Sequence, residues 1–227
     1  MSHLKTLVSP KSWPTGRKTK VFVARPSSGP HAIMRCITPN VLLQELLKIT
    51  KTRKETRQVL REGNFLIDQR KREDYKFPVG LFDIISLPVT KEDFVLIYDT
   101  KGKFQLHKIK SENAKTKLCK IVGKTMLKGK KTQLNISGGC NIIIDKDTYK
   151  VGDSVKLSIP DLKIKGHIKF EKGASVYLVG GKHVGKTGKI EEIKKLGVEE
   201  DRIIIKTKDD KIETLKNYSI VIEDGLL

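Results

Sequence analysis

The sequence predicts an α+β protein that is mostly β. We expect a basic extended N-terminal arm, a small helix–helix–strand domain, a central antiparallel β domain and a C-terminal small β barrel. Three observations predict this class. A stretch rich in basic residues, proline and glycine opens the chain, helical periodicity follows over about residues 38–62, and short β-rich runs punctuated by glycine fill most of the rest. The expected segments are residues 1–37, 38–88, 89–170 and 171–227.

The balance of charge predicts a polyanionic partner. The 227 residues include 46 Lys+Arg against 26 Asp+Glu, which gives a formal net charge of +20. Self-repulsion of this size is tolerable when a polyanion neutralises it, and each Lys or Arg placed on a phosphate releases a condensed counterion. Nucleic acid is therefore the expected partner. A membrane surface would require an amphipathic helix with large apolar residues, and the sequence has none.

Cysteine usage and targeting patterns predict a cytoplasmic protein. The three cysteines, Cys36, Cys119 and Cys140, are far apart and form no C-x-x-C pair, which predicts a reducing compartment and no zinc site. No apolar run reaches the length of a membrane span, and the N-terminus lacks the apolar core of a signal peptide. Prolines from Pro10 to Pro30 would break the amphipathic helix of an organellar transit peptide.

The first segment, residues 1–37, contains no acidic residue, and the first one in the chain is Glu45. Proline, glycine and serine interrupt this segment, so it cannot bury enough apolar surface to fold alone. We expect a basic extension that becomes ordered on RNA, with aromatic side chains including Phe22 available to stack on bases. A solvated tail is the alternative. The candidate RNA-contacting residues are Lys5, Lys11, Trp13, Arg17, Lys18, Lys20, Arg25, His31 and Arg35.

A first helix is predicted from TPNVLLQELLKIT, residues 38–50. Thr38 is a candidate N-cap, and Pro39 stands at the first helical position, where its missing N–H is not needed. Apolar residues then recur at helical spacing and are expected to form the buried face. These residues are Val41, Leu42, Leu46 and Ile49.

A second helix is predicted from TRKETRQVLREGN, residues 52–64. Thr52 and Glu55 form a capping box, and Gly63 is a structural glycine that can stop the helix. At about 100° per residue, the apolar positions fall on one arc and the cations on another. One face therefore packs while the other presents positive charge. The candidate RNA-contacting residues are Arg53, Lys54, Arg57 and Arg61, with Lys71 beyond the helix.

The basic helix, followed by Gly-x-Phe-Leu-Ile and a short strand, resembles the alpha-L RNA-binding domain. This small module occurs in ribosomal proteins, pseudouridine synthases and some tRNA synthetases. The stretch that carries the resemblance is TRKETRQVLREGNFLID, residues 52–68. It departs at Gln69, where many members have a glycine, so a different turn is expected there. A merely solvated charged face is the alternative for such a helix.

The third segment has the pattern of an antiparallel β domain. FVLIYDTKGKFQLHKI, residues 94–109, predicts a hairpin around a Lys-Gly turn. Further short runs up to about residue 170 follow without intervening helices. His107 and His167 are isolated among these runs. We expect them to be structural or RNA-facing and not metal ligands, because no carboxylate or cysteine cluster accompanies them.

The stretch GGKHVGKT, residues 180–187, satisfies the G-x-x-x-x-G-K-T pattern of phosphate-binding loops. Three observations count against a nucleotide hydrolase. Only about forty residues remain for the βαβ crossovers that such a loop requires. The next apolar run ends in Lys206, where a magnesium-binding Asp is needed, and Gly188 stands where the phosphate-binding helix should start.

Extended to VGGKHVGKTGKI, the same stretch resembles a KOW unit, which forms a small SH3-like barrel in ribosomal proteins and transcription elongation factors. The structural glycines Gly181, Gly185 and Gly188 would allow positive φ and a close approach of a nucleic-acid backbone. The loop cations would then meet phosphates. The candidate RNA-contacting residues here are Lys182, His183, Lys186 and Lys189.

The order of segments and several further stretches resemble one family over nearly the whole chain. HLKTLVSPKSW, RPSSGPH, FPVGLFDIIS, YDTKGKFQLHKI, KLCKIVGK and IKFEKGASVYLVGGKHVGKTGKI are similar to the eukaryotic-type small-subunit ribosomal protein four family, shared by archaea and eukaryotes. RPSSGPH and YDTKGKF are the most specific. Thr6 and Ser12 depart from it, since many relatives have basic or histidine residues there. The short end after the last strand favours an archaeal source.

The resemblance implies a non-catalytic protein bound to the 5′ domain of small-subunit rRNA, in the body of the subunit, where it supports assembly and translation. Neighbouring small-subunit proteins are implied as partners, with no cofactor, membrane or small-molecule substrate. Two other classes stay open. An RNA-modifying enzyme would need clustered Asp, His or Cys or a cofactor fingerprint. A transcription-associated KOW protein would not be expected to carry the alpha-L pattern and the basic arm.

Overall fold

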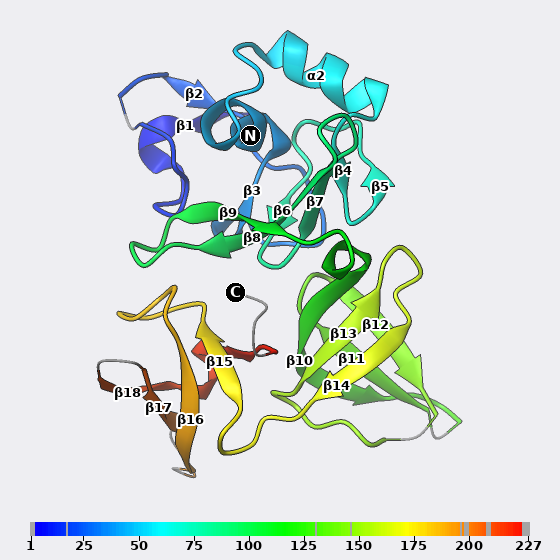
Figure 1. Cartoon of the computed structure of the whole chain (residues 1–227), viewed down its shortest axis with the longest axis vertical. Coiled ribbons are helices and arrows are strands. Elements are labelled where there is room, and N and C mark those ends of the chain that lie inside the picture. The colour runs from blue at the N-terminus through cyan, green and yellow to red at the C-terminus, as the bar shows by residue number, and fades with distance from the viewer. Residues whose placement is uncertain are drawn as a thin grey trace. The chain divides into compact units, whose positions relative to one another are not determined.

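The structure is a computed structural model that describes residues 3–16, 18–129, 131–145, 147–195, 197, 200–207 and 210–223 (Figure 1). Short strands in antiparallel sheets make up most of its regular structure, which confirms the mostly β prediction. The chain divides into two compact units. Unit 1 contains residues 1–99 and 103–117, and unit 2 contains residues 100–102 and 118–227.

The N-terminal arm is an integral part of unit 1. Strand β1 (Leu4–Lys5) pairs antiparallel with β2 (Phe22–Val23). Trp13 is 2% exposed, and its indole Nε1 donates a hydrogen bond of 2.7 Å to the Cys36 carbonyl. A buried indole N–H needs such a partner. Trp13 therefore anchors the arm, and its buried ring does not present the exposed face for base stacking that the sequence led us to expect. The arm is ordered by packing against the rest of unit 1.

The first predicted helix is shorter than expected and partly of π type. Helix α1 (Pro39–Val41) passes directly into a π-helical turn, η3 (Leu42–Leu46). Thr38 precedes α1, but its side chain makes no capping hydrogen bond. A π turn is wider than an α turn and rotates the side chains that follow it. Ile49 is accordingly 51% exposed, although the periodicity predicted that it would be buried.

Helix α2 (Arg53–Glu62) forms as predicted. Thr52 and Glu55 make both hydrogen bonds of the capping box, and Gly63 ends the helix in the left-handed region at φ 79°. A glycine can adopt this conformation without the penalty of a Cβ atom. The fully buried residues of α2 are Thr56 and Leu60, which the sequence assigned to the packed face.

A five-stranded antiparallel sheet of order β5-β4-β7-β8-β9 completes unit 1, and β3 pairs with β6 beside it. The predicted hairpin is present as β8 and β9, and β8 pairs with β7. It therefore belongs to unit 1, whereas the predicted boundary at residue 89 placed it in the central domain. Residues 88–91 connect β7 to β8 as a hairpin, with Leu87 opposite Glu92. The bounds are β3 (Cys36–Ile37), β4 (Leu66–Ile67), β5 (Arg70–Lys71), β6 (Val79–Gly80), β7 (Ile84–Leu87), β8 (Glu92–Tyr98) and β9 (Phe104–Ile109).

The turn between β4 and β5 explains how the chain tolerates Gln69. Asp68 and Gln69 both have positive φ, 50° and 57°, as a two-residue hairpin turn of type I′ requires, and the second position usually holds glycine. The Gln69 side-chain amide donates hydrogen bonds to the Ser86 hydroxyl at 2.9 Å and to the Ala114 carbonyl at 3.5 Å. These bonds offset the backbone strain.

Replacement of Gln69 separates these two effects. We expect Gln69→Ala to lower the free energy of unfolding of unit 1 by about 1–2 kcal/mol, because it removes both hydrogen bonds and keeps the strained turn. Gln69→Gly should stay near wild type, since relief of the positive φ, about 1 kcal/mol, offsets the lost bonds. The chain has one tryptophan, Trp13, so its fluorescence in a urea titration reports on unit 1. Equal destabilisation by both variants would argue against strain in this turn.

Unit 1 also encloses a network of charges. The Lys117 Nζ lies 2.6 Å from a carboxylate oxygen of Asp68 and 2.6 Å from one of Asp83. The His31 Nε2 lies 3.0 Å from Asp83 Oδ2, and the Gly80 N–H donates to the same oxygen at 2.8 Å. A Cβ atom at Gly80 would lie 2.2 Å from the His31 ring, so only glycine lets the ring reach Asp83. His31 therefore tethers the arm to Asp83, a structural role that the sequence did not indicate, and its contact with RNA stays a prediction.

The pKa values of the two buried carboxyls move in opposite directions. Burial raises the pKa of Asp83, but the charge of Lys117, the His31 contact and the Gly80 amide outweigh it and hold this pKa at about 2, below the ordinary 3.8. Burial and the charge of Asp83 raise the pKa of Asp68, and Lys117 compensates only in part. Asp83 is therefore the anion that holds Lys117 in the interior.

Unit 2 contains two five-stranded sheets, of order β12-β11-β10-β13-β14 and β18-β17-β16-β15-β19. Inward-facing aliphatic residues alternate with outward-facing polar ones in both, as sheets with one buried face require. The bounds of the first sheet are β10 (Thr116–Met126), β11 (Thr132–Ile136), β12 (Cys140–Ile144), β13 (Ser154–Ser158) and β14 (Ile164–Ile168). Those of the second are β15 (Ser175–Leu178), β16 (Thr187–Lys194), β17 (Arg202–Lys206), β18 (Lys211–Leu215) and β19 (Ser219–Val221).

Polar side chains join the two sheets of unit 2. The Lys120 Nζ donates to three carbonyls in and beside a 3₁₀ turn of residues 216–218, the shortest bond being 2.8 Å to Ser219. His167 Nε2 lies 2.7 Å from the Asp153 carboxylate, which also accepts the Phe170 N–H at 2.9 Å. His167 is therefore structural, one of the two roles expected for it.

Candidate nucleic-acid interface

The outward side of α2 carries a row of cations, here called the α2 stripe: Arg53, Lys54, Arg57 and Arg61, all exposed. Both acids of the helix are engaged elsewhere, because Glu55 closes the capping box and Glu62 accepts a hydrogen bond from Gln58 at 2.9 Å. Among the described residues, no carboxylate forms an ion pair with the stripe. A shallow groove of about 430 Å³ runs along it. The stripe is therefore uncompensated positive charge.

Tyr75 is a member of this surface that the sequence did not reveal. The guanidinium carbons of Arg57 and Arg53 lie 4.5 Å and 5.7 Å from its ring centre, and the Lys76 Nζ lies 5.5 Å away. Partial burial raises the pKa of Tyr75, but the Arg57 hydrogen bond and the surrounding cations hold it below its usual value. The ring orients two arginines of the stripe through cation–π contacts. Only the tertiary structure brings residue 75 beside α2.

The other predicted cations of unit 1 differ in their surroundings. Lys20 forms an ion pair of 3.3 Å with Glu45, and Lys71 forms one of 3.1 Å with Glu73. Arg25 is half-buried. Arg17 lies outside the described residues. The remaining predicted cations of the arm are exposed: Lys5, Lys11, Lys18 and Arg35.

The glycine loop of unit 2 connects two antiparallel strands. β15 leads into the loop and β16 follows it, so no helix begins at the position where a hydrolase would bind phosphate. Gly181 and Gly185 have φ of 79° and 81°. A Cβ atom at Gly188 would lie 2.7 Å from the Lys206 carbonyl oxygen. These glycines shape a hairpin, and the phosphate-binding loop is excluded as a structure.

The cations of this loop lie on and beside the hairpin. Lys182 and Lys189 are exposed, whereas His183 and Lys186 are half-buried. The Lys186 carbonyl accepts a hydrogen bond of 3.0 Å from the Leu178 N–H, which fixes the base of the loop. The two exposed lysines are therefore free to reach a ligand in solution.

A cross-strand row of lysines, here called the lysine row, extends this surface. Lys189 of β16 lies directly opposite Lys206 of β17, which lies directly opposite Lys211 of β18, and all three are exposed. Directly opposed like charges destabilise a sheet. Lys211 has an ion pair of 2.7 Å with Glu191, but Lys189 and Lys206 have none within the described residues. The sequence alone does not identify Lys206 as a candidate, because its neighbours depend on strand register.

The described parts of the chain offer no alternative site for a metal. No group of three or more His, Cys, Asp or Glu side chains in them could hold an ion. The buried Cys36 thiol has its pKa raised to about 12 by burial and by the charge of Asp83, so it stays protonated. None of the helices in the described residues is long and apolar enough to cross a membrane.

Fold and surface together define a class of protein: a basic, mostly β chain whose cations are gathered on solvent-facing sides of its helix and sheets. Comparisons with known proteins agree. Residues 2–34 match the RS4NT (NUC023) domain, and residues 90–164 match Ribosomal family S4e. The chain is 41% identical to small ribosomal subunit protein eS4 of Methanococcus aeolicus over 98% of its length and 94% of the relative. It is 38% identical to eS4 of Methanocaldococcus jannaschii, with the same coverage.

A solved structure supports the same assignment. The crystal structure of the 30S ribosomal protein S4e from Thermoplasma acidophilum superimposes with a TM-score of 0.72 at 28% identity, over 84% of this chain and 96% of that one. The chain belongs to the eS4 family of small ribosomal subunit proteins.

Proposed function

We propose that this chain is a non-catalytic, structural constituent of the small ribosomal subunit that binds small-subunit rRNA. The observation that carries the proposal is the uncompensated charge of the α2 stripe and of Lys189 and Lys206 in the lysine row. Like charges held side by side without acidic partners destabilise a fold unless an external polyanion neutralises them. RNA supplies such a polyanion at regular spacing, and its backbone and shape suit recognition by exposed cations.

The finer parts of the proposal rest on resemblance together with this geometry. The helices and first strands of unit 1 act as an alpha-L module, and the glycine hairpin of unit 2 acts as a KOW unit. The ribosomal partner is the 5′ domain of the rRNA in the body of the subunit, in the cytoplasm, where the protein supports assembly beside neighbouring ribosomal proteins. The proposed contacts are the α2 stripe, the arm residues Lys5, Lys11, Lys18 and Arg35, and Lys182, Lys189 and Lys206 of unit 2.

Binding of the purified chain to a 5′-domain transcript, measured as a function of salt, tests the proposal. We expect tight binding at low ionic strength and an affinity that falls steeply and linearly in log–log form as salt rises. A structured RNA of equal length and unrelated sequence is the control and should bind more weakly. Equal affinity for both RNAs at every salt concentration, or no binding at low salt, would refute a ribosomal role.

Replacement of a lysine in the lysine row is expected to stabilise the sheet and to weaken RNA binding. Lys206→Gln should raise the stability of the β16–β17 pairing by about 0.2–0.5 kcal/mol at low salt, because it removes one of two opposed charges. The same change should reduce the salt slope for RNA by about 1, since one phosphate contact is lost. Hydrogen exchange at the amides of β16 and β17 measures the first effect, and RNA titrations measure the second. Lys195→Gln, an exposed lysine outside the row, is the matched control. A loss of both stability and affinity would contradict this account.

A further inference from the structure

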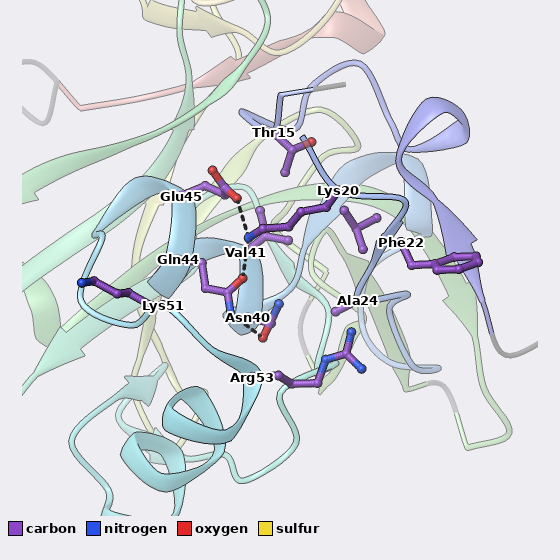
Figure 2. A pocket seen from close by; sticks show the side chains of 11 residues that line it. Thr15, Lys20, Phe22, Ala24, Asn40, Val41, Gln44, Glu45, Lys51 and Arg53 are labelled. Atoms are coloured by element: carbon purple, nitrogen blue, oxygen red, sulfur yellow. Dashed lines mark hydrogen bonds and ion pairs between the residues drawn. The ribbon is translucent and has the colours of Figure 1, made fainter. Parts of the chain in front are cut away.

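A pocket of about 300 Å³ opens in unit 1 between the arm and the segment from α1 to α2 (Figure 2). Ala24 of the arm and Val41 of α1, each 3% exposed, form part of an apolar wall. Asn40, Gln44 and Lys20 line the polar side, and Arg53 stands at the edge. We call this cavity the arm pocket. Its volume is at the low end of those that hold small organic ligands.

Hydrogen-bond chemistry fixes the direction of the amide groups in the arm pocket. The Lys20 ammonium can only donate, and it bonds to Gln44 Oε1 at 3.2 Å. Gln44 Nε2 then donates to Asn40 Oδ1 at 3.4 Å (Figure 2). The chain of donors leaves the Asn40 Nδ2 as its last member, with no acceptor among the described residues.

This last donor opens to solvent through the arm pocket, although most of the Asn40 residue is buried. Its exposed fraction is 6%, and its side chain lines the arm pocket. A buried polar group without a partner costs free energy, so such groups generally face water or a ligand. The pocket thus presents one oriented N–H donor against an apolar wall, which is the chemistry that recognises a flat group with a carbonyl acceptor.

Arg53 links the arm pocket to the α2 stripe, because it belongs to both. A ligand seated here would have its phosphate beside Arg53 and its flat part against Ala24 and Val41. Unpaired nucleotides of RNA have this construction, and proteins bind them by burying the base and reading its edge. A donor at the base edge favours the keto bases uracil and guanine over adenine and cytosine, which carry an amino donor at the corresponding position.

We infer that the arm pocket binds one unpaired keto nucleotide of the RNA, with Asn40 as the reading residue. The inference rests on the proposed function for the identity of the polymer. It adds a sequence-reading element to a surface that otherwise contacts only phosphates. Gln44 and Lys20 are positioning residues, since they act through the orientation of the Asn40 amide.

Short oligonucleotides test this assignment with the full chain. U₄ and A₄ have equal phosphate charge, so a difference between them reports on the base. We expect U₄ to bind about fivefold or more tightly than A₄ and to shift the Asn40 side-chain amide signals of ¹⁵N-labelled protein in a saturable way. Inorganic phosphate should leave those signals in place. Equal affinity for U₄ and A₄, or movement of the Asn40 signals by phosphate alone, would overturn the inference.

Two variants of the arm pocket test whether it causes the preference for U₄. Asn40→Asp replaces the donor with an acceptor and should abolish the preference for U₄, with a loss of about tenfold or more in U₄ affinity. Asn113→Asp makes the same change at an exposed position of unit 1 and should retain the preference. Because Asn40→Asp alters a buried residue, Thr15→Trp provides an independent obstruction at the half-buried lining of the pocket and should also abolish the preference. Retention of the preference in both pocket variants would refute the role of Asn40.

The outcome is separable from that of the proposed function. Both pocket variants should bind the 5′-domain transcript within about threefold of wild type, because phosphate contacts dominate the total affinity. Transcript binding without a preference for U₄ would eliminate the pocket and leave the ribosomal role intact. A preference for U₄ without transcript binding would support the pocket assignment and refute the ribosomal role.

Discussion

Asp83→Asn is expected to lower the free energy of unfolding of unit 1 by about 3–5 kcal/mol. The Asp83 carboxylate is 2.6 Å from the Lys117 ammonium and also holds His31 and the Gly80 amide. Removal of its charge takes one carboxylate partner from Lys117, whose side chain is 5% exposed and which also contacts Asp68 at 2.6 Å. A buried cation that loses a partner is not rehydrated, so most of the desolvation cost remains.

Urea titration followed by Trp13 fluorescence measures this loss, because Trp13 is buried in the same unit. Asp161→Asn is the matched control: the chemical change is the same, and Asp161 is exposed in unit 2. We expect the control to unfold with wild-type stability. A decrease below about 1 kcal/mol for Asp83→Asn would mean that the network is solvated and contributes no more than a surface pair.

The pH dependence of stability follows from the same carboxyl. The pKa of Asp83 in the folded state is about 2 and lies below the ordinary 3.8. A depressed pKa stabilises the fold above the unfolded value, so this contribution of about 2 kcal/mol is present above about pH 4 and is lost as pH falls towards 2. The raised pKa of Asp68 acts in the opposite sense and does not add to the loss. In Asp83→Asn the acid-induced loss should shrink, and an unchanged acid profile would exclude Asp83 as its source.

The second large effect is expected on RNA binding. Simultaneous replacement of Arg53, Arg57 and Arg61 by glutamate should weaken binding to the 5′-domain transcript by about 100-fold or more at low salt and should flatten the salt slope by about 2–3. Each arginine lost removes the release of about one counterion, and each glutamate adds repulsion. Because the three side chains are exposed and make no ion pair among the described residues, α2 should remain folded.

A control triplet distinguishes a contact surface from general charge. Lys163, Lys165 and Lys172 are exposed in unit 2, outside the proposed contacts, and their replacement by glutamate changes the net charge equally. We expect the control to reduce affinity by less than about tenfold, because charges beyond a Debye length of the RNA are screened. Equal losses in both triplets would indicate a diffuse electrostatic attraction. Unchanged affinity and slope in the arginine triplet would remove α2 from the interface.

Residues of the candidate interface were predictable where the signal is local. The stripe follows from helical periodicity between the capping box and Gly63, and both limits are confirmed. Tyr75 and Lys206 were missed, because one reaches α2 only through the fold and the other joins Lys189 only through strand register. The burial of Trp13 was not foreseen for the same reason. A tryptophan in a basic, proline-rich arm has the composition of a stacking residue, and nothing local indicates that it is buried.

The sequence by itself determined the charge of this protein, its mostly β class, the limits of α2 and the hairpin of β8 and β9. These features depend on composition and on residues a few positions apart, whose preferences act within one element. Only the tertiary structure decided that the arm is bound into unit 1 and that the boundary of this unit lies near residue 117. It alone joined His31, Asp83 and Lys117 in one buried network. Such contacts form between segments distant in the chain, and their energy depends on burial and distance, which no local pattern encodes.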